Sequence, residues 1–589
     1  MLRVAAPAFA LVLQAPAPPP SAPPTAPQAT TKAFRQWMDG LEVGGAEQHT
    51  SREGTSEQHR QRAWVTLSRM GITVQQEELE LARRHADGSL TFTWRLQLAT
   101  EPLEGEARWS PAHPDQLEVR PKGGDPKAVP VPEGALLWPP DQEAKLREAA
   151  RLRQPVKTLT YTFAVQQWST LELSPLGPDP LPGHLDAIRF RGQETEGTQA
   201  MASEVWISPT EGELRHRTNL GGVEVLTQVA DLPAPSATGL KENLFARTLK
   251  PIPFHAFLPW LPALAVRQEG GDPVTLAKGP EAEALGPGRW RLHRAAPPTA
   301  AEAAELPVTG TPTAEEVRYL APSPLVPFKD SAFDGLLRRL APRPGTSRWE
   351  LARAVNRFVF DWITEKDYGV GFATALEVAR VPRGDCTEHG VLAVALLRKL
   401  GVPARGAVGW VALDDVLGPH FWVEVKLGTR WIPLDPTFDQ APASTFRLKL
   451  GDTDLADLGS VGWEGVQVLG PAQWIPTLPD PRIEGDRLTA PDGTRLRWPK
   501  GRWVWASGRL VLLTGEGRLE LAAEGRPTEA QLRDARKLQV AGGRQGWWTP
   551  GRSLHLELGD GRWLKVEGLR ESEAFAFLQG LIVEFARPQ

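Results

Sequence analysis

Two short segments of this sequence, GDCTEHGVLAVALLRKLGVPAR at 384–405 and HFWVEVKLGTRWIPLDPT at 420–437, hold the residues that decide its predicted fold. In chain order they contain Cys386, His420 and Asp435, and Cys386 is the only cysteine among 589 residues. A thiol, an imidazole and a carboxylate can act as a nucleophile, its general base and the group that orients the base. These three residues are therefore the predicted catalytic set.

The first segment is predicted to form a buried helix that begins at Cys386. Asp385 and Glu388 have the spacing of a capping box with Asp385 as the N-cap, and Gly401 supplies a stop signal. Residues 391–397 are apolar on every side, which is typical of a helix at the centre of a domain. Cys386 would then lie in the first turn, where unpaired N–H groups and the helix dipole favour a thiolate and can stabilise an oxyanion.

The second segment is predicted to form a hairpin. Its first eight residues alternate in polarity as a strand does, and residues 428–429 are a candidate two-residue turn before a return strand. With that turn, Asp435 is opposite Trp422, which shares a sheet face with His420. His420 and Asp435 become diagonal neighbours, roughly 7–8 Å apart at the backbone, within reach of each other's side chains. A three-residue loop would instead place them on opposite faces.

Several residues in these segments have a second interpretation. His389 is a rival base, but it lies one turn along the same helix without a paired carboxylate, so a packing role is favoured. Trp422 either lines a substrate channel or packs in the core, and Glu388 and Glu424 are predicted to be structural. A lone cysteine in an apolar helix is usually a small buried hydrophobe. The whole constellation favours the functional interpretation of Cys386.

The two segments resemble the transglutaminase-like family, whose domain has a Gly-x-Cys element, a His-x-Trp-x-Glu strand and an Asp-Pro strand end. In this sequence these elements are at 384–386, 420–424 and 435–437. The run at 400–405 is similar to the family's connection between the helix and the first strand. The resemblance is clear over the 54 residues of this stretch and, with the preceding helices, extends from about residue 315 to 450.

The resemblance implies a papain-like fold and a triad of Cys386, His420 and Asp435 that transfers an acyl group through a thioester. The expected substrate is a protein or peptide, attacked at a glutamine side-chain amide or a peptide bond, with water or a primary amine as acceptor. Tyr368 and Trp362 are candidates for the second oxyanion donor, by proximity in the chain.

Three functions stay open at this point. A cross-linking acyltransferase must keep water away from the acyl-enzyme, whereas a cysteine peptidase or amidase admits it. The third is a non-catalytic, peptide-binding scaffold. An intact triad argues against the scaffold, because a scaffold has no need of all three residues.

Composition narrows the classes of partner. The chain has 67 Lys and Arg against 71 Asp and Glu, a net charge of −4, and no basic run, so no nucleic-acid partner is expected. One cysteine rules out intrachain disulfides, and the 11 histidines are scattered without ligand spacing, so neither a metal nor another cofactor is expected. The 55 glycines, 56 prolines and 22 tryptophans favour a β-rich, turn-rich protein.

The N-terminus resembles a secretory signal, because the apolar residues 4–13 precede a proline-rich linker at 15–28. We therefore predict an exported protein, periplasmic or extracellular, whose mature chain begins between about residues 10 and 30. No apolar run elsewhere reaches the length of a membrane-spanning helix, so no transmembrane span is expected in the mature chain.

The predicted fold class is α+β, with a papain-like transglutaminase core flanked by β-rich N- and C-terminal domains. Helical spacing predicts helices at 142–153, 349–363, 372–380 and 571–585. The predicted domains are a signal-like segment and linker at 1–30, a β-rich domain at 31–235, a short β-containing connection at 236–310, the catalytic domain at 311–455, and a small β domain with a C-terminal helix at 480–589.

Overall fold

The computed structural model describes residues 29–585 apart from a set of short segments. Those segments are 39, 70–71, 98–101, 123, 164–165, 197–198, 221–222, 232–248, 271–273, 278, 310, 367–372, 456–472, 516, 540–544 and 559–561. The predicted signal-like segment and the predicted domain boundary at 235/236 therefore lie outside the described residues, apart from residues 29 and 30.

The N-terminal part of the chain is one antiparallel sheet of fourteen strands, in the order β8-β7-β6-β5-β4-β3-β2-β1-β14-β13-β12-β11-β10-β9. Alternate side chains are buried along β5, among them Leu90, Phe92 and Trp94. Helix α1 (Pro139–Leu152), which begins three residues before its predicted start, packs on β12 and β13. The strands are β1 Thr30–Met38, β2 Leu41–Glu53, β3 Ser56–Arg69, β4 Ile72–Arg84, β5 Leu90–Gln97, β6 Leu103–Ser110, β7 His113–Pro121, β8 Lys127–Pro130, β9 Val156–Thr162, β10 Gln167–Pro178, β11 Ile188–Glu196, β12 Gln199–Ser208, β13 Gly212–Leu220 and β14 Val223–Ala230.

A second, four-stranded sheet connects the parts of the molecule, in the order β17-β18-β16-β23. Its first three strands precede the segment with the predicted triad, and its fourth follows that segment, so the segment is an insertion in this sheet. Its strands are β16 Ala263–Glu269, β17 Ala282–Gly286, β18 Arg289–His293 and β23 Gln473–Thr477. Two short elements, β15 Lys250–Pro251 and η1 Leu258–Trp260, precede it in the chain.

The central segment packs helices against a five-stranded sheet, ordered β15-β20-β19-β22 with β21 paired to β20. Helix α8 contacts α6 and α7 on one side and β19 and β20 on the other. Helix α7 begins later than predicted because Thr374 and Glu377 form a capping box. The elements are α3 Ala300–Ala303, α4 Ala314–Leu320, α5 Ala332–Leu340, α6 Arg348–Trp362, α7 Ala375–Arg380, α8 Cys386–Lys399, β19 Ala404–Leu413, β20 Val416–Leu427, β21 Arg430–Leu434 and β22 Arg447–Thr453.

Helix α8 is buried along almost its whole length, as its apolar sequence predicts. Its close approach to the sheet depends on Gly390, where an added Cβ would lie 2.2 Å from the ring of Phe421 on β20. The core around α8 contains Val391, Leu392 and Val394, all without exposure. This packing fixes the start of α8 relative to the strand that carries His420.

The C-terminal part has a seven-stranded sheet, ordered β27-β28-β29-β33-β32-β31-β30, and a small sheet, ordered β24-β25-β26-β34. The predicted terminal helix ends early: α11 stops at Gly580, where a Cβ would meet the Trp498 ring at 2.6 Å, and the chain then pairs with β26. The elements are β24 Arg482–Glu484, β25 Arg487–Thr489, β26 Arg495–Arg497, β27 Gly501–Ala506, β28 Arg509–Thr514, β29 Gly517–Glu524, α10 Glu529–Leu532, β30 Arg536–Gln539, β31 Gln545–Thr549, β32 Ser553–Glu557, β33 Trp563–Glu567, α11 Glu571–Gly580 and β34 Ile582–Glu584.

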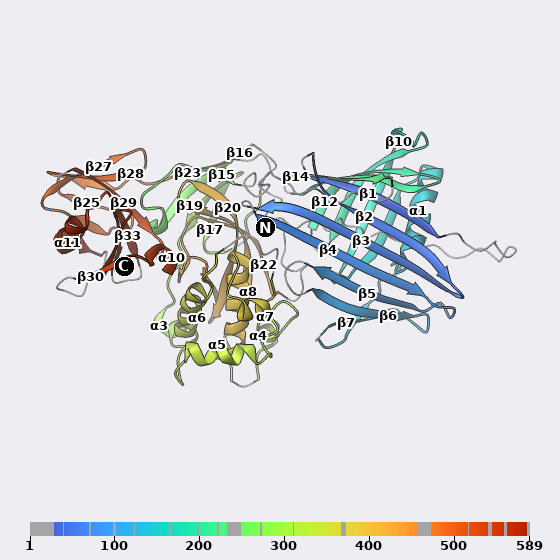
Figure 1. Cartoon of the computed structure of the whole chain (residues 1–589), viewed down its shortest axis with the longest axis horizontal. Helices are drawn as coiled ribbons and strands as arrows, with labels where there is room; N and C mark the ends of the chain where they lie inside the picture. Colours follow the sequence, from blue (N-terminus) through green and yellow to red (C-terminus); the bar gives the residue numbers. More distant parts are fainter. Residues whose placement is uncertain are drawn as a thin grey trace.

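The three parts lie in a row, with the N-terminal sheet at one end, the C-terminal sheets at the other and the helices of the central segment between them (Figure 1). Among the described residues, no helix combines the length and the apolar character that crossing a membrane requires.

The predicted α+β class with a papain-like core is wrong, because strands make up 50% of the structure and helices only 18%. Large antiparallel sheets, not a helix-rich core, set the architecture. Long strands such as β3, with the sequence SEQHRQRAWVTLSR, contain a run of polar side chains at 56–62 that hides the alternation typical of strands.

Candidate active site

Cys386 is the first residue of α8, and its neighbours explain why the helix begins there. The Asp385 carboxylate accepts a hydrogen bond from the Thr387 N–H at 3.0 Å, and Glu388 accepts one from the Asp385 N–H at 2.9 Å. This is the capping box predicted from the sequence. Cys386 is partly exposed while the next twelve residues of the helix are buried, so a rigid element presents the thiol.

The glycine two residues before Cys386 is required by this arrangement. Gly384 has φ of +141°, a conformation that L side chains rarely adopt. A Cβ at this position would also lie 2.3 Å from Cγ of Glu388. Because Glu388 closes the capping box, any side chain at 384 would disturb the start of α8.

The hairpin has the predicted register, with Leu427 paired to Arg430 across a two-residue turn. His420 and Asp435 consequently lie close together, with His420 Nε2 2.7 Å from Asp435 Oδ2. The predicted hydrogen bond between His420 and Asp435 is therefore present. Because Nε2 is engaged with the carboxylate, Nδ1 is the ring nitrogen left for another partner.

Asp435 is fully buried, and its carboxylate has three partners. Oδ2 contacts His420 and also Arg447 Nη2, each at 2.7 Å, and Oδ1 accepts a hydrogen bond from the Thr437 N–H at 3.0 Å. Burial alone would raise the pKa of Asp435, but the charges of His420 and Arg447 together lower it further, to well below its usual range. Asp435 is therefore ionised throughout the neutral pH range.

Two aromatic rings pack beside the imidazole of His420, nearly parallel to it. The Trp422 ring is nearly parallel to it at 6.3 Å between centroids, and the Phe438 ring is nearly parallel at 5.1 Å. Trp422 is buried with 2% exposure, so of its two predicted roles the structure supports the one in the core. Stacked rings on a buried imidazole restrict its rotation and keep Nε2 on the carboxylate.

Cys386, His389 and His420 line one cavity of about 740 Å³, which we call the thiol cavity. Residues of the C-terminal sheet, including Glu524 and Lys565, line it as well. The thiol cavity therefore lies between the central segment and the C-terminal sheet, the two parts that adjoin in Figure 1. The structure brings Cys386 and His420 to one cavity, with Asp435 hydrogen-bonded to His420.

His389, the rival base, is fully buried, and its Nδ1 lies 2.6 Å from the backbone oxygen of Asp385. Since a carbonyl oxygen only accepts, Nδ1 carries the proton. Burial, followed by the charge of Lys366, lowers the pKa of His389 to about 3. A general base must gain a proton near the working pH, so these features favour the packing role.

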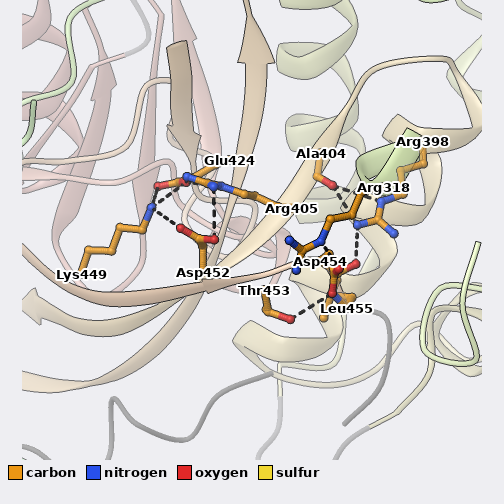
Figure 2. A network of polar contacts seen from close by, with 10 residues as sticks. All are labelled: Arg318, Arg398, Ala404, Arg405, Glu424, Lys449, Asp452, Thr453, Asp454 and Leu455. Atoms are coloured by element: carbon orange, nitrogen blue, oxygen red, sulfur yellow. Dashed lines mark hydrogen bonds and ion pairs between the residues drawn. The ribbon is translucent and has the colours of Figure 1, made fainter. Parts of the chain in front are cut away.

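Glu424, in the His-x-Trp-x-Glu element, belongs to a polar network on the sheet (Figure 2). Its carboxylate pairs with Arg405 on β19 and with Lys449 on β22, each at 2.7 Å, and Asp452 contacts both cations. Glu424 thus ties together three strands of the sheet that carries His420. Glu388 has a comparable structural role, because it also accepts a hydrogen bond from the Ala373 N–H at 2.9 Å.

Trp362 and Tyr368 are the two oxyanion donors suggested by the sequence. Trp362 Nε1 donates to the backbone oxygen of Val378 at 3.1 Å, so its indole is already engaged. Tyr368 lies outside the described residues. At the start of α8, the Thr387 N–H is also engaged, because it donates to the Asp385 carboxylate.

Sequence reasoning missed Arg447, Phe438 and Lys366. Arg447 begins β22 and Phe438 lies in the tight loop that Asp435 and Gln440 close by mutual backbone hydrogen bonds. No periodicity links either residue to His420, and only their nearness to the Asp-Pro element was a signal. Lys366 lines the thiol cavity, and its ammonium donates to the Thr437 backbone oxygen at 3.0 Å.

Within the described residues, no group of three or more His, Cys, Asp and Glu side chains is arranged to hold a metal ion. The carboxylates on the strands around His420 are engaged with cations, Asp435 with Arg447 and Glu424 with Arg405.

Comparisons with known proteins point to one family. Residues 337–436, which include all three predicted catalytic residues, match the transglutaminase-like superfamily. A search of curated proteins found no match.

Among solved structures, the chain is similar to a β-barrel-like protein of a domain of unknown function from Brucella abortus, at 8% identity and a TM-score of 0.28, covering 35% of this chain and 97% of that one. It is similar to a candidate cysteine protease from Cytophaga hutchinsonii at 15% identity and a TM-score of 0.23, covering 39% and 86%. A candidate protease from Parabacteroides distasonis matches at 10% identity and a TM-score of 0.16, covering 82% and 91%.

Proposed function

Residues 337–436 belong to the transglutaminase-like superfamily, and on that premise we propose that this protein is a thiol enzyme acting on glutamine side-chain amides or peptide bonds. The observation that carries the proposal is the buried His420–Asp435 pair, 2.7 Å apart, beside a cavity that Cys386 also lines. A packing interpretation explains neither the ionised, fully buried carboxylate nor the partly exposed thiol at a helix start.

In the first half of the reaction, Cys386 loses its proton to Nδ1 of His420, and the thiolate forms a bond to the carbonyl carbon. The carbonyl oxygen becomes an oxyanion, which the positive end of the α8 dipole stabilises. His420 then returns the proton to the amide nitrogen as the C–N bond breaks. Ammonia or an amine leaves, and a thioester on Cys386 remains.

In the second half, water or a primary amine gives a proton to His420 and attacks the thioester carbon. The C–S bond breaks, the product acid or amide forms, and the thiolate is reprotonated. Water as the acceptor makes the protein an amidase or peptidase, and an amine makes it a cross-linking acyltransferase. Both products come from the same acyl-enzyme, so one experiment distinguishes them.

Asp435 stabilises the imidazolium formed in each half-reaction and holds the tautomer with the proton on Nε2. Arg447 shares the same carboxylate oxygen with His420, so Asp435 has a counter-charge when the imidazole is neutral. In this proposal Arg447 is a positioning residue, because it acts through Asp435 and does not contact the thiol cavity.

The test is incubation of the full chain with a glutamine-containing peptide, with and without a primary amine, followed by mass spectrometry. We expect deamidated or cleaved peptide in water and an amine adduct when the amine competes, with neither product from Cys386→Ala. Thiol alkylation of Cys386 should be faster in the wild type than in His420→Ala. Equal product from Cys386→Ala and wild type would refute the thiol mechanism.

A further inference from the structure

A second cavity, of about 700 Å³, adjoins the thiol cavity, and its lining includes Phe360, Lys366, Arg526, Arg533, Trp547 and Trp563. We call it the basic cavity. Five residues line both cavities, namely Phe360, Lys366, Arg526, Pro527 and Thr528. Because these five residues line both cavities, the two cavities are adjacent, and a molecule bound in the thiol cavity can extend into the basic cavity.

The basic cavity is built by two parts of the chain that are far apart in sequence. Phe360 and Lys366 come from α6 and the residues after it, whereas Trp547 and Trp563 come from β31 and β33 of the C-terminal sheet. Arg526 joins the two sides, because it pairs with Asp361 at 3.0 Å. The C-terminal sheet therefore completes a site that the central segment begins.

The cations of this cavity are only partly neutralised. Arg357 and Arg526 pair with Asp439, at 2.9 Å and 3.4 Å. Lys366 and Arg533 have no ion pair with the described residues. Glu557 is the remaining carboxylate in the lining. The lining thus has two cations without an ion pair among the described residues and one further carboxylate.

Lys366 is the cation at the junction of the two cavities. Its ammonium contacts the Thr437 backbone oxygen at 3.0 Å and lies 3.6 Å from the centroid of the Phe360 ring. Burial lowers the pKa of Lys366 to about 8, although Asp435, Asp361 and Asp439 act in the opposite direction. A half-buried ammonium in this state gains from an added anion, because its charge is poorly compensated.

The cavity also has a planar, apolar side. The Trp547 and Trp563 rings are 5.2 Å apart between centroids, and Trp563 is buried with its Nε1 lacking a hydrogen-bond partner in the described part of the chain. Aromatic rings beside unpaired cations suit a peptide segment that ends in, or carries, a carboxylate.

Resting on the proposed function, we propose that the basic cavity is a substrate subsite that binds a carboxylate near the scissile amide, with Lys366 and Arg533 as its cations. The carboxylate is either an acidic side chain or the free C-terminus of the substrate, and the two sources share this chemistry. The substrate class is therefore an acidic or C-terminally free peptide, not an internal neutral segment of a protein.

The test measures binding of peptides to the full-length Cys386→Ala protein by calorimetry, which requires no turnover. Three glutamine peptides are compared: one amidated and neutral, one with a free C-terminus, and one amidated with a glutamate beside the glutamine. We expect at least one acidic peptide to bind roughly tenfold more tightly than the neutral one, the effect of a charge-assisted contact.

Added to Cys386→Ala, Lys366→Met or Arg533→Gln should reduce that ratio towards one. Arg533 is exposed, so its replacement tests the subsite even if the Lys366 variant folds poorly. The matched control is Arg502→Gln, an exposed arginine on β27 outside the cavity lining, which should keep the ratio. Equal binding of all three peptides, or a ratio that survives both cavity substitutions, would overturn the subsite.

Turnover by the wild-type protein separates this inference from the proposed function. Equal turnover of the neutral and acidic peptides would refute the subsite but would still support the thiol mechanism. Selective binding without any turnover would support the subsite and count against the mechanism.

Discussion

Two histidines in different parts of this molecule have carboxylates beside them, and their geometries differ. In the central segment, His420 Nε2 lies 2.7 Å from Asp435. In the N-terminal sheet, His216 lies between Glu194 and Glu213, at 3.9 Å and 3.8 Å. The first distance is a hydrogen bond, and the other two are too long for one.

The charge states differ accordingly. Arg447 and His420 keep Asp435 ionised despite its burial. In the N-terminal sheet, burial and the nearby Glu143 raise the pKa of Glu213 to about 7 against the opposing charge of Lys32, and burial lowers the pKa of His216 to about 4. Hydrogen bonds and the charge of Arg447 thus offset the desolvation of Asp435, whereas Glu213 is too far from His216 for a hydrogen bond and its pKa is raised.

The largest expected difference between the two regions is in catalysis. His420→Ala should lower kcat/KM by roughly 10⁴-fold, because the thiol loses its base. His216→Ala should leave kcat/KM within about twofold, since His216 belongs to the N-terminal sheet and not to the proposed site. Steady-state kinetics on a glutamine peptide checks both variants. A comparable loss in His216→Ala would show that the two histidines do not differ in their importance for catalysis.

Asp435→Asn should cost roughly 10³-fold in kcat, because an amide cannot stabilise the imidazolium and does not enforce the same tautomer. The substitution also leaves Arg447 buried without its counter-ion, which destabilises the fold. Thermal unfolding of the variant separates the two effects. Near-normal kcat in a folded Asp435→Asn protein would contradict the role proposed for the carboxylate.

Arg447→Met should have a smaller effect, about a tenfold loss of kcat/KM, because it removes one charged contact of Asp435. The pKa of Asp435 should rise, since Arg447 is one of the charges that lower it. A carboxylate with a lowered folded pKa stabilises the protein above its unfolded pKa, and this stability is lost as the pH falls through the folded pKa.

In Arg447→Met the stability contributed by Asp435 should therefore be smaller and be fully lost at a higher pH than in the wild type, and the acid limb of the pH–rate profile should also move to higher pH. Arg447→Lys keeps the positive charge and should partly restore both the stability at acid pH and the position of the acid limb. An unchanged profile in Arg447→Met would mean that Arg447 only packs against Trp422, whose ring it overlies at 5.4 Å.

The sequence predicted the local geometry of the site better than the architecture around it. The capping box at Asp385 and the two-residue turn after Leu427 are short-range features with their own physical signals, so the helix start and the hairpin register followed. Arg447 and the C-terminal wall of the thiol cavity depend on tertiary packing. The fold class failed because fourteen strands pair into one sheet through contacts that no local pattern reveals.

The smallest expected effect tests the N-terminal side of the comparison. Glu213 has a folded pKa raised to about 7 from the ordinary glutamate value of 4.5. Between these two values the folded state holds more protons than the unfolded state, so Glu213 lowers stability as the pH rises from about 4.5 to about 7. His216 acts in the opposite direction, because its folded pKa is lowered from 6.5 to about 4.

The two contributions overlap and partly cancel in the wild type, so only a difference between two proteins isolates Glu213. Glu213→Gln replaces the titratable carboxyl group with an amide of similar shape. The free energy of unfolding of the variant, relative to that of the wild type, should rise by on the order of 1 kcal/mol from pH 5 to pH 7. Denaturant unfolding at the two pH values measures this, with kcat/KM unchanged as the control. If the gap between the two proteins is the same at both pH values, Glu213 is already ionised in the folded protein. The N-terminal group would then resemble the His420–Asp435 pair in its charge, and the contrast between the regions would rest on hydrogen-bond distance alone.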